Sequence, residues 1–196
     1  MPDQAADGLL SPFLSRWRLR HALPHVHGRV LDVGCGTGSA CDWIDAAQYC
    51  GVEPDAASLA GARQAHPGFR FLESLPVGER FDTVLALAVL EHGEDPAALL
   101  RQLASHLAPG GRIVATTPAP LIGPLHQLGA RLGIFSPAAA AEHKNLLGKK
   151  QLDALASEAE LAWLHYKRFL LGANQLLVLR RAIVQGNGWR AATIVA

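Results

Sequence analysis

The chain has 196 residues, enough for one domain that buries roughly 70% of the surface exposed when unfolded. Its apolar fraction of 49%, charged fraction of 18% and net charge of +1 indicate a globular protein and argue against a basic nucleic-acid-binding surface. The chain has three cysteines without metal-ligand spacing and shows no signal-peptide layout, so we expect a cytoplasmic protein. It has no apolar run of ~20 residues, so we expect no stable membrane insertion.

Apolar residues at helical spacing predict an N-terminal helix over Ser11–Val26 that lies across the core. The β-rich runs that follow are Arg29–Val33, Tyr49–Val52, Arg70–Leu72, Phe81–Leu87 and Arg112–Thr117. The helical stretches that separate most of them are Ser39–Ala47, Ala56–Ala65 and Pro96–Leu107. Since nearly all-apolar strands alternate with helices, we expect a parallel sheet covered on both faces. Residues 73–80 are too few for a full helix, so that crossover is abbreviated.

The pattern changes after Thr117, where an apolar stretch interrupted by prolines extends to about His143. A helix is predicted over Gly148–Glu158, followed by β-rich runs at Leu161–Phe169 and Asn174–Arg180. The short link between those runs permits an antiparallel hairpin but not a parallel crossover. The sequence therefore predicts an α/β fold with a doubly wound, seven-stranded, mostly parallel sheet whose last strand is antiparallel.

The most informative segment is VLDVGCGTG, in which a buried strand leads into Gly34, Gly36 and Gly38. Glycine permits positive φ and lets a ligand lie against bare backbone. The predicted helix that follows would present free amide groups to ligand oxygens. A glycine-rich turn is by itself a weak signal, because it also serves as a tight connection without a ligand.

Two carboxylates strengthen the ligand-binding interpretation. Asp32 lies within an otherwise apolar strand, where an unpaired charge is costly, so a ligand ammonium at the strand end would stabilise it. Glu53 stands about twenty residues beyond the glycines, where doubly wound folds place an acid that binds both ribose hydroxyls.

These motifs carry a family resemblance. VLDVGCGTG, GVEPDAASLAGAR, FDTVLALAVLEHGEDP and LAPGGRIVATTP resemble the successive motifs of class I S-adenosylmethionine-dependent methyltransferases, in particular the bacterial small-molecule group. The resemblance covers about Arg29 to Pro118 and is weaker through the last helix and strands. It implies a Rossmann-like fold, S-adenosylmethionine as cofactor and a small-molecule methyl acceptor, but it does not specify that acceptor.

The resemblance also implies roles by position. Asp32 and the backbone of Gly34, Cys35, Gly36 and Gly38 would contact the methionine part of the cofactor. Glu53 would bind the ribose hydroxyls. The residues expected beside adenine are Pro54, Asp55, Glu73 and Ser74, although many relatives have a longer Gly-Asp-Ala stretch near position 73. The residues expected to flank the sulfonium are Leu87 and Ala88.

A general base is needed only if the nucleophile must lose a proton, as a hydroxyl would. His92, after the fourth strand, and His143, before the later helix, are the candidate catalytic residues; each has a structural alternative, as a turn cap or as a partner of Glu142. We interpret Glu91 as structural and Cys35 as a small buried residue. The remaining histidines have no zinc-site spacing, so no metal is expected. Trp17, Trp43, Trp163 and Phe169 are predicted in the core.

We expect a single methyltransferase domain over residues 1–196. Its parts are an N-terminal helical segment (1–28), a cofactor-binding core (29–118), a lid or substrate region (119–147), a final helix with two strands (148–182) and a tail of unassigned role (183–196). The apolar lid region is interpreted as a cover for a partly hydrophobic acceptor, with core packing and a homodimer interface left open. The alternative functions are a non-catalytic S-adenosylmethionine-binding regulatory protein and a nicotinamide-dependent oxidoreductase.

Overall fold

The computed structural model describes residues 11–120 and 146–182. Its elements in chain order are α1 (Ser11–Ala22), η1 (Leu23–His25), β1 (Val30–Val33), β2 (Tyr49–Val52), α2 (Ala56–Ala65), β3 (Arg70–Leu72), β4 (Phe81–Leu87), α3 (Pro96–Ser105), β5 (Leu107–Pro118), α6 (Lys149–Glu158), β6 (Leu161–Phe169) and β7 (Asn174–Arg181). The predicted N-terminal helix is present, but its α-helical part ends at Ala22 because Pro24 lies in the short 3-10 helix η1.

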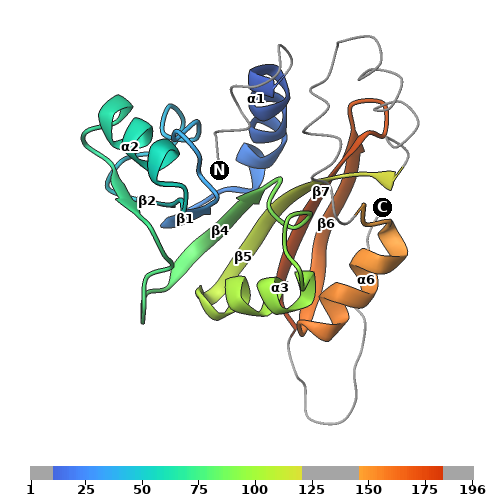
Figure 1. Cartoon of the computed structure of the whole chain (residues 1–196). Helices are drawn as coiled ribbons and strands as arrows, with labels where there is room; N and C mark the ends of the chain where they lie inside the picture. Colours follow the sequence, from blue (N-terminus) through green and yellow to red (C-terminus); the bar gives the residue numbers. More distant parts are fainter. Residues whose placement is uncertain (1–10, 121–145, 183–196) are drawn as a thin grey trace.

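The predicted seven-stranded sheet is confirmed, with strand order β3-β2-β1-β4-β5-β7-β6. The pairs among β1 to β5 are parallel, whereas β7 pairs antiparallel with both β5 and β6. The strand order reverses between β1 and β4, which lie side by side (Figure 1). Ligands of open α/β sheets bind beyond the carboxyl ends of the strands at such a reversal.

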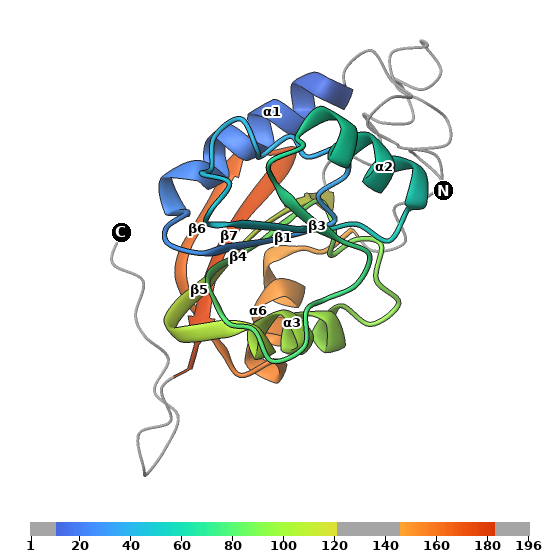
Figure 2. The same cartoon turned by 90° about the vertical axis from the view of Figure 1, so that its left-hand side faces the viewer.

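Helices cover both faces of the sheet, as expected (Figure 2). On one face, Leu100 of α3 and Leu152 of α6 join one core cluster with strand residues such as Ile113. On the other face, Leu19 of α1 and Leu59 of α2 pack in a second cluster. All four residues of β1 are buried, which explains why every residue of that strand except Asp32 is apolar.

The helix predicted over Ser39–Ala47 is wrong. This segment forms successive turns, in which the N–H groups of Gly38, Cys41 and Trp43 each donate to the carbonyl three residues earlier. Gly36 and Gly38 have positive φ, so the chain enters this segment from a turn conformation that a right-handed helix does not share. The prediction that Trp43 lies in the core is wrong too, because its side chain is 67% exposed.

The fifth strand begins earlier than predicted, at Leu107 instead of Arg112. Leu107 pairs with Phe81, and after an irregularity the register resumes with Arg112 opposite Thr83. Gly111 makes the irregularity possible, because a Cβ there would lie 2.9 Å from the carbonyl oxygen of Phe81.

Several predictions concern residues outside the described part of the chain. They are the lid region between residues 121 and 145, His143 within it, and the tail from residue 183. Among the described helices, none has both the length and the apolar character to cross a membrane.

Candidate active site

The carboxyl ends of β1, β2 and β4 meet around the glycine turn. The N–H groups of Gly34 and Cys35 donate to the carbonyl of Val52, at the end of β2, over 2.8 and 3.2 Å. On the other side, a Cβ at Gly34 would lie 2.8 Å from Cγ2 of Val89, and Gly34 has a φ of +70°. Glycine at this position therefore permits both the turn and the close approach of the segment that follows β4.

Glu53 reaches from the end of β2 into the glycine turn. Its Oε2 accepts a hydrogen bond of 3.0 Å from the N–H of Gly36, and its Oε1 accepts one of 2.9 Å from the N–H of Asp55. Pro54 connects Glu53 to Asp55, which is the N-cap of α2. A Cβ at Gly36 would meet nothing within 4 Å, so the backbone here is open to a ligand. Because each carboxylate oxygen has a second acceptor site, Glu53 retains the capacity to bind two hydroxyls.

Asp32 is buried in β1 beneath this turn, with 5% of its surface exposed. The hydroxyl of Tyr49 donates to Oδ2 of Asp32 over 2.8 Å. Burial raises the pKa of Asp32 to about 7, the hydrogen bond from Tyr49 opposes this shift, and the charge of Glu53 adds to it. A cation at the strand end would therefore stabilise the ionised carboxylate. Sequence reasoning missed Tyr49, although its register opposite Val30 on the neighbouring strand placed it within reach.

Cys35 is the small buried residue that the sequence indicated. Burial raises the pKa of its thiol, which makes it a poor nucleophile. Its Sγ packs against the backbone of Gly51. A Cβ at Gly51 would lie only 2.8 Å from that sulfur, so glycine leaves room for it. Gly38 in turn packs under α2, because a Cβ there would lie 2.9 Å from Cδ2 of His66.

The other predicted cofactor residues lie along the same edge. The N–H of Glu53 donates to the carbonyl of Leu72 at 3.0 Å, which places Glu73 and Ser74, both exposed, just beyond the neighbouring strand. At the end of β4, Ala88 has a φ of 57° and its N–H donates to the carbonyl of Thr116 at 2.9 Å. Leu87 precedes it and is half-buried.

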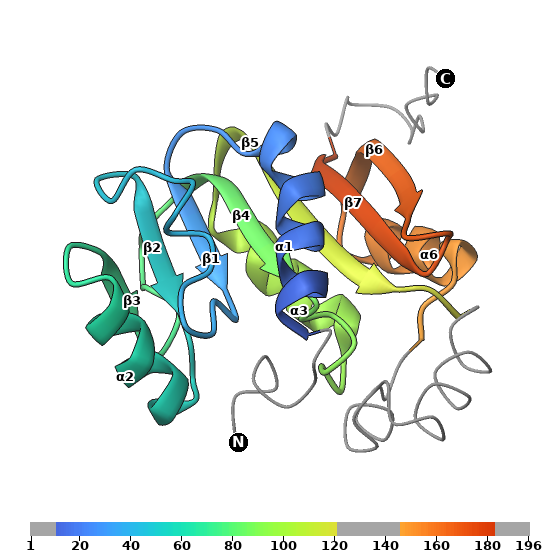
Figure 3. The same cartoon turned by 90° about the horizontal axis from the view of Figure 1, so that it is seen from above.

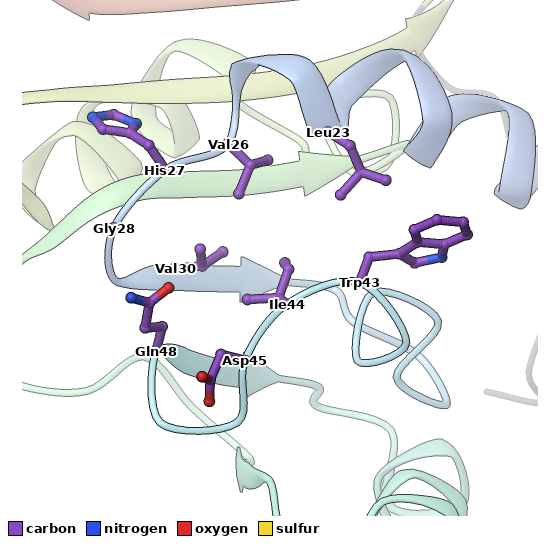
Figure 4. Close-up of a pocket in the computed structure, with 9 residues that line it drawn as sticks. All are labelled: Leu23, Val26, His27, Gly28, Val30, Trp43, Ile44, Asp45 and Gln48. Carbon is purple, nitrogen blue, oxygen red and sulfur yellow. The ribbon is translucent and has the colours of Figure 1, made fainter.

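A separate cavity of about 170 Å³ lies on the α1 side of β1, beside η1 (Figure 4). Its lining residues are Leu23, Val26, His27, Gly28, Val30, Trp43, Ile44, Asp45 and Gln48. None of the predicted site residues lines it, and small-molecule sites usually measure about 300–1,000 Å³. We therefore locate the candidate site at the strand ends instead of in this cavity.

Comparison with known proteins agrees with this geometry. Residues 7–166 match a family model described as a methyltransferase domain. The chain belongs to this methyltransferase family. The resemblance to class I S-adenosylmethionine-dependent methyltransferases is thereby confirmed, together with the expected Rossmann-like fold.

Curated relatives of this chain include two ubiquinone biosynthesis O-methyltransferases. The protein of Nitrobacter winogradskyi is 38% identical over 99 residues, which cover 45% of this chain and 38% of the relative. The protein of a Bradyrhizobium species is 38% identical over 99 residues, covering 45% of this chain and 39% of the relative. The match thus spans about two fifths of the length of these relatives.

Solved structures share the fold over most of the chain. Magnesium protoporphyrin IX methyltransferase from Synechocystis, with bound S-adenosylhomocysteine, has a TM-score of 0.69 and 17% identity and covers 91% of both chains. An S-adenosylmethionine-dependent methyltransferase from Mesorhizobium loti has a TM-score of 0.66 and 22% identity, with 89% of this chain and 99% of that one covered.

The two predicted catalytic histidines are not brought together within the described structure. His92 is exposed on the segment after β4, and His143 lies outside the described residues. The neighbouring Glu91 is fully buried instead. Sequence reasoning missed Arg18 of α1, whose guanidinium interacts electrostatically with Glu91. It also missed Asn174 of β7, whose Oδ1 accepts a 3.1 Å hydrogen bond from Nε of Arg18. Only the long-range packing of the fold brings these residues together.

Proposed function

We propose that this chain transfers a methyl group from S-adenosylmethionine to a small, partly hydrophobic acceptor. The observation that carries the proposal is the arrangement of Glu53, the open glycine turn and buried Asp32 at the reversal between β1 and β4. A turn that only connected two elements would need neither the buried carboxylate nor the second one reaching across from β2.

The residues fit the cofactor in chemistry as well as in position. Asp32 would accept the ammonium of the methionine part, which supplies the positive charge that this buried carboxylate lacks. Glu53 would bind the ribose hydroxyls with its remaining lone pairs. Leu87 and Ala88 would border the reactive carbon. The bound cofactor would supply an activated methyl group, so the main work of the chain is to align the acceptor and exclude water, which contributes about 7–11 kcal/mol in well-ordered systems.

The acceptor would bind on the β5 side of the cofactor, and the stretch interpreted as a lid would cover it. The described ends of this stretch support its attachment at the carboxyl edge of the sheet. Nε2 of Gln175, in β7, donates to the carbonyl of Pro118 at 3.2 Å and to that of Leu147 at 2.8 Å. One buried amide therefore holds together two points that are far apart in sequence.

Calorimetry provides the direct test of the cofactor. We expect micromolar binding of S-adenosylmethionine and S-adenosylhomocysteine and no comparable binding of NAD or NADP. Tight dinucleotide binding without S-adenosyl binding would refute the proposal. Tight S-adenosyl binding without transfer to any member of a metabolite panel would instead favour a non-catalytic, regulatory role.

We further propose that the chain acts in the cytoplasm as one domain and without nucleic acid. The modest net charge of +1 supports the last point. Light scattering at several protein concentrations distinguishes a monomer from a homodimer.

A further inference from the structure

Glu91 follows β4 and has 0% of its surface exposed. No hydrogen bond from a described residue reaches either oxygen of its carboxylate. An unsatisfied buried polar group costs about 1–3 kcal/mol, and a charged group costs more. Because most buried polar side-chain atoms in proteins are hydrogen-bonded, this carboxylate requires an explanation.

The surroundings of Glu91 are polar and come from several elements. Arg18 projects from α1, which lies across the sheet over β4 and β5 (Figure 3), and it donates to Asn174 at the start of β7. At the end of β5, the hydroxyls of Thr116 and Thr117 are buried and have no hydrogen-bond partner among the residues that the structure describes. Arg18 and Glu91 interact electrostatically, and the hydroxyl of Thr117 lies near the carboxylate, so these residues form a polar cluster with Asn174 within an otherwise apolar layer. The side chain of Thr116 points to the opposite face of the strand.

The groups around Glu91 only partly offset the cost of burying its negative charge. Burial, the largest effect, raises its pKa, while the backbone N–H of Glu91 itself, the charges of Arg18 and His92 and the nearby hydroxyl of Thr117 oppose the rise. Burial likewise lowers the pKa of Arg18, and the charge of Glu91 opposes that shift. These opposing effects do not offset the full burial of the carboxylate, so its pKa stays raised.

The cluster adjoins the site of methyl transfer. Glu91 follows Ala88 by three residues, and Val89 between them packs against the glycine turn at Gly34. Asp32 and Glu53 thus lie toward β2, whereas Glu91 lies on the opposite side, toward α1 and β5. A cofactor held by the first pair would have its acceptor on the side of Glu91.

Resting on the proposed function, we propose that the carboxylate of Glu91 binds the hydroxyl of the methyl acceptor and takes up its proton. Arg18 positions that carboxylate. The hydroxyl oxygen forms a bond to the methyl carbon while the bond from this carbon to the sulfonium sulfur breaks, and that electron pair stays on sulfur. The hydroxyl proton moves to Glu91, which later releases it to water. Since Glu91 is fully buried, the residues that cover it must move for the acceptor to enter.

A hydroxyl fits this cluster better than an amine. A neutral amine attacks without prior loss of a proton and needs no base, while a cationic ammonium would be repelled by Arg18. Burial raises the pKa of Glu91, which makes this buried carboxylate a stronger base than an exposed one. The oxygen specificity named for the curated relatives is consistent with this choice.

The first test uses the wild-type chain saturated with S-adenosylhomocysteine. Binding is measured for phenol, catechol, benzyl alcohol and 1-hexanol and for the methyl ether of each, which lacks the hydroxyl proton. At least one hydroxyl probe should bind about tenfold more tightly than its ether, as one charge-assisted hydrogen bond predicts. Equal binding within every pair overturns the proposal, and this comparison requires no variant to fold.

The second test compares Glu91→Gln with Glu94→Gln, a nearby exposed control. With the best hydroxyl probe and S-adenosylmethionine, Glu91→Gln should lower kcat by about 10²–10⁴-fold, while S-adenosylhomocysteine affinity changes less than about threefold. The control should retain wild-type kcat. Wild-type turnover by Glu91→Gln, or transfer to aniline but to no hydroxyl probe, overturns this proposal and leaves the proposed function standing. Absence of S-adenosylhomocysteine binding by the wild-type chain would instead refute the proposed function.

Discussion

Replacing Glu53 with alanine should weaken cofactor binding by about tenfold to 10³-fold and leave the fold intact. The estimate follows from the structure, because the carboxylate spans from β2 to the N–H of Gly36 and retains lone pairs for two ribose hydroxyls. Charge-assisted hydrogen bonds contribute about 1.5–3 kcal/mol each, so losing one costs at least about tenfold in affinity. Losing two costs up to about 10³-fold once non-additivity is allowed for.

Calorimetry with S-adenosylhomocysteine measures this effect, and Glu94→Ala serves as an exposed control of the same residue type. A second ligand, the analogue without the ribose 2′-hydroxyl, identifies the contact. The wild-type chain should bind this analogue more weakly than the parent ligand, whereas Glu53→Ala should bind both alike. An unchanged dissociation constant together with normal melting would remove Glu53 from the site. Equal discrimination by both proteins would show that the ribose is bound elsewhere.

The remaining predictions concern the glycine turn, the buried carboxylate and the exposed histidine. Gly34→Ala should lower the melting temperature more than Gly36→Ala, because only the former meets a neighbour, at 2.8 Å, while Gly36→Ala should chiefly weaken cofactor binding. Tyr49→Phe leaves the Asp32 carboxylate without its donor and should reduce the free energy of unfolding by about 1–3 kcal/mol, measured by urea denaturation. Since the folded pKa of Asp32 is raised to about 7 from an ordinary 3.8, the folded chain binds the extra proton between these values. Stability without cofactor should therefore fall as pH rises through that window, cofactor affinity should rise as the carboxylate ionises, and Asp32→Asn should remove both trends. His92→Ala should change turnover less than tenfold if Glu91 is the base, and a loss of about 10²–10⁴-fold would return that role to His92.

Most of the sheet could be predicted because local pattern and global fold agree there. The boundaries of β2, β3, β4 and α2 coincide with those expected, since apolar runs and capping residues such as Asp55 mark them directly. The segment after the glycine turn misled the prediction, because its composition suits a helix. The positive φ of Gly36 and Gly38 leads the chain into successive turns instead, and backbone conformation is not a property of composition.

The cofactor-binding residues could be predicted from the sequence, whereas the cluster around Glu91 could not. Asp32, the glycines and Glu53 lie on consecutive elements, so spacing alone brought them together. The cluster around Glu91 joins α1, β4, β5 and β7, whose meeting depends on the complete topology. From the sequence, His92 is preferred to Glu91 as the candidate base because histidine is the commoner general base. The motif does not show that Glu91 is buried and His92 is exposed.

Asp32 and Glu91 together suggest why this edge tolerates two buried carboxylates. Burial raises the pKa of both, and each lies beside the position expected for a cationic cofactor. In the proposed reaction, Glu91 begins as an anion near a sulfonium and ends protonated near a neutral thioether. Charge therefore disappears from both groups in the same step, and separated charges are not created in a site of low dielectric. Glutamine at position 91 cannot take up the proton of the acceptor hydroxyl. In Glu91→Gln that proton must instead reach water across an apolar layer. The same burial that is costly in the empty chain thus favours the neutral products of transfer.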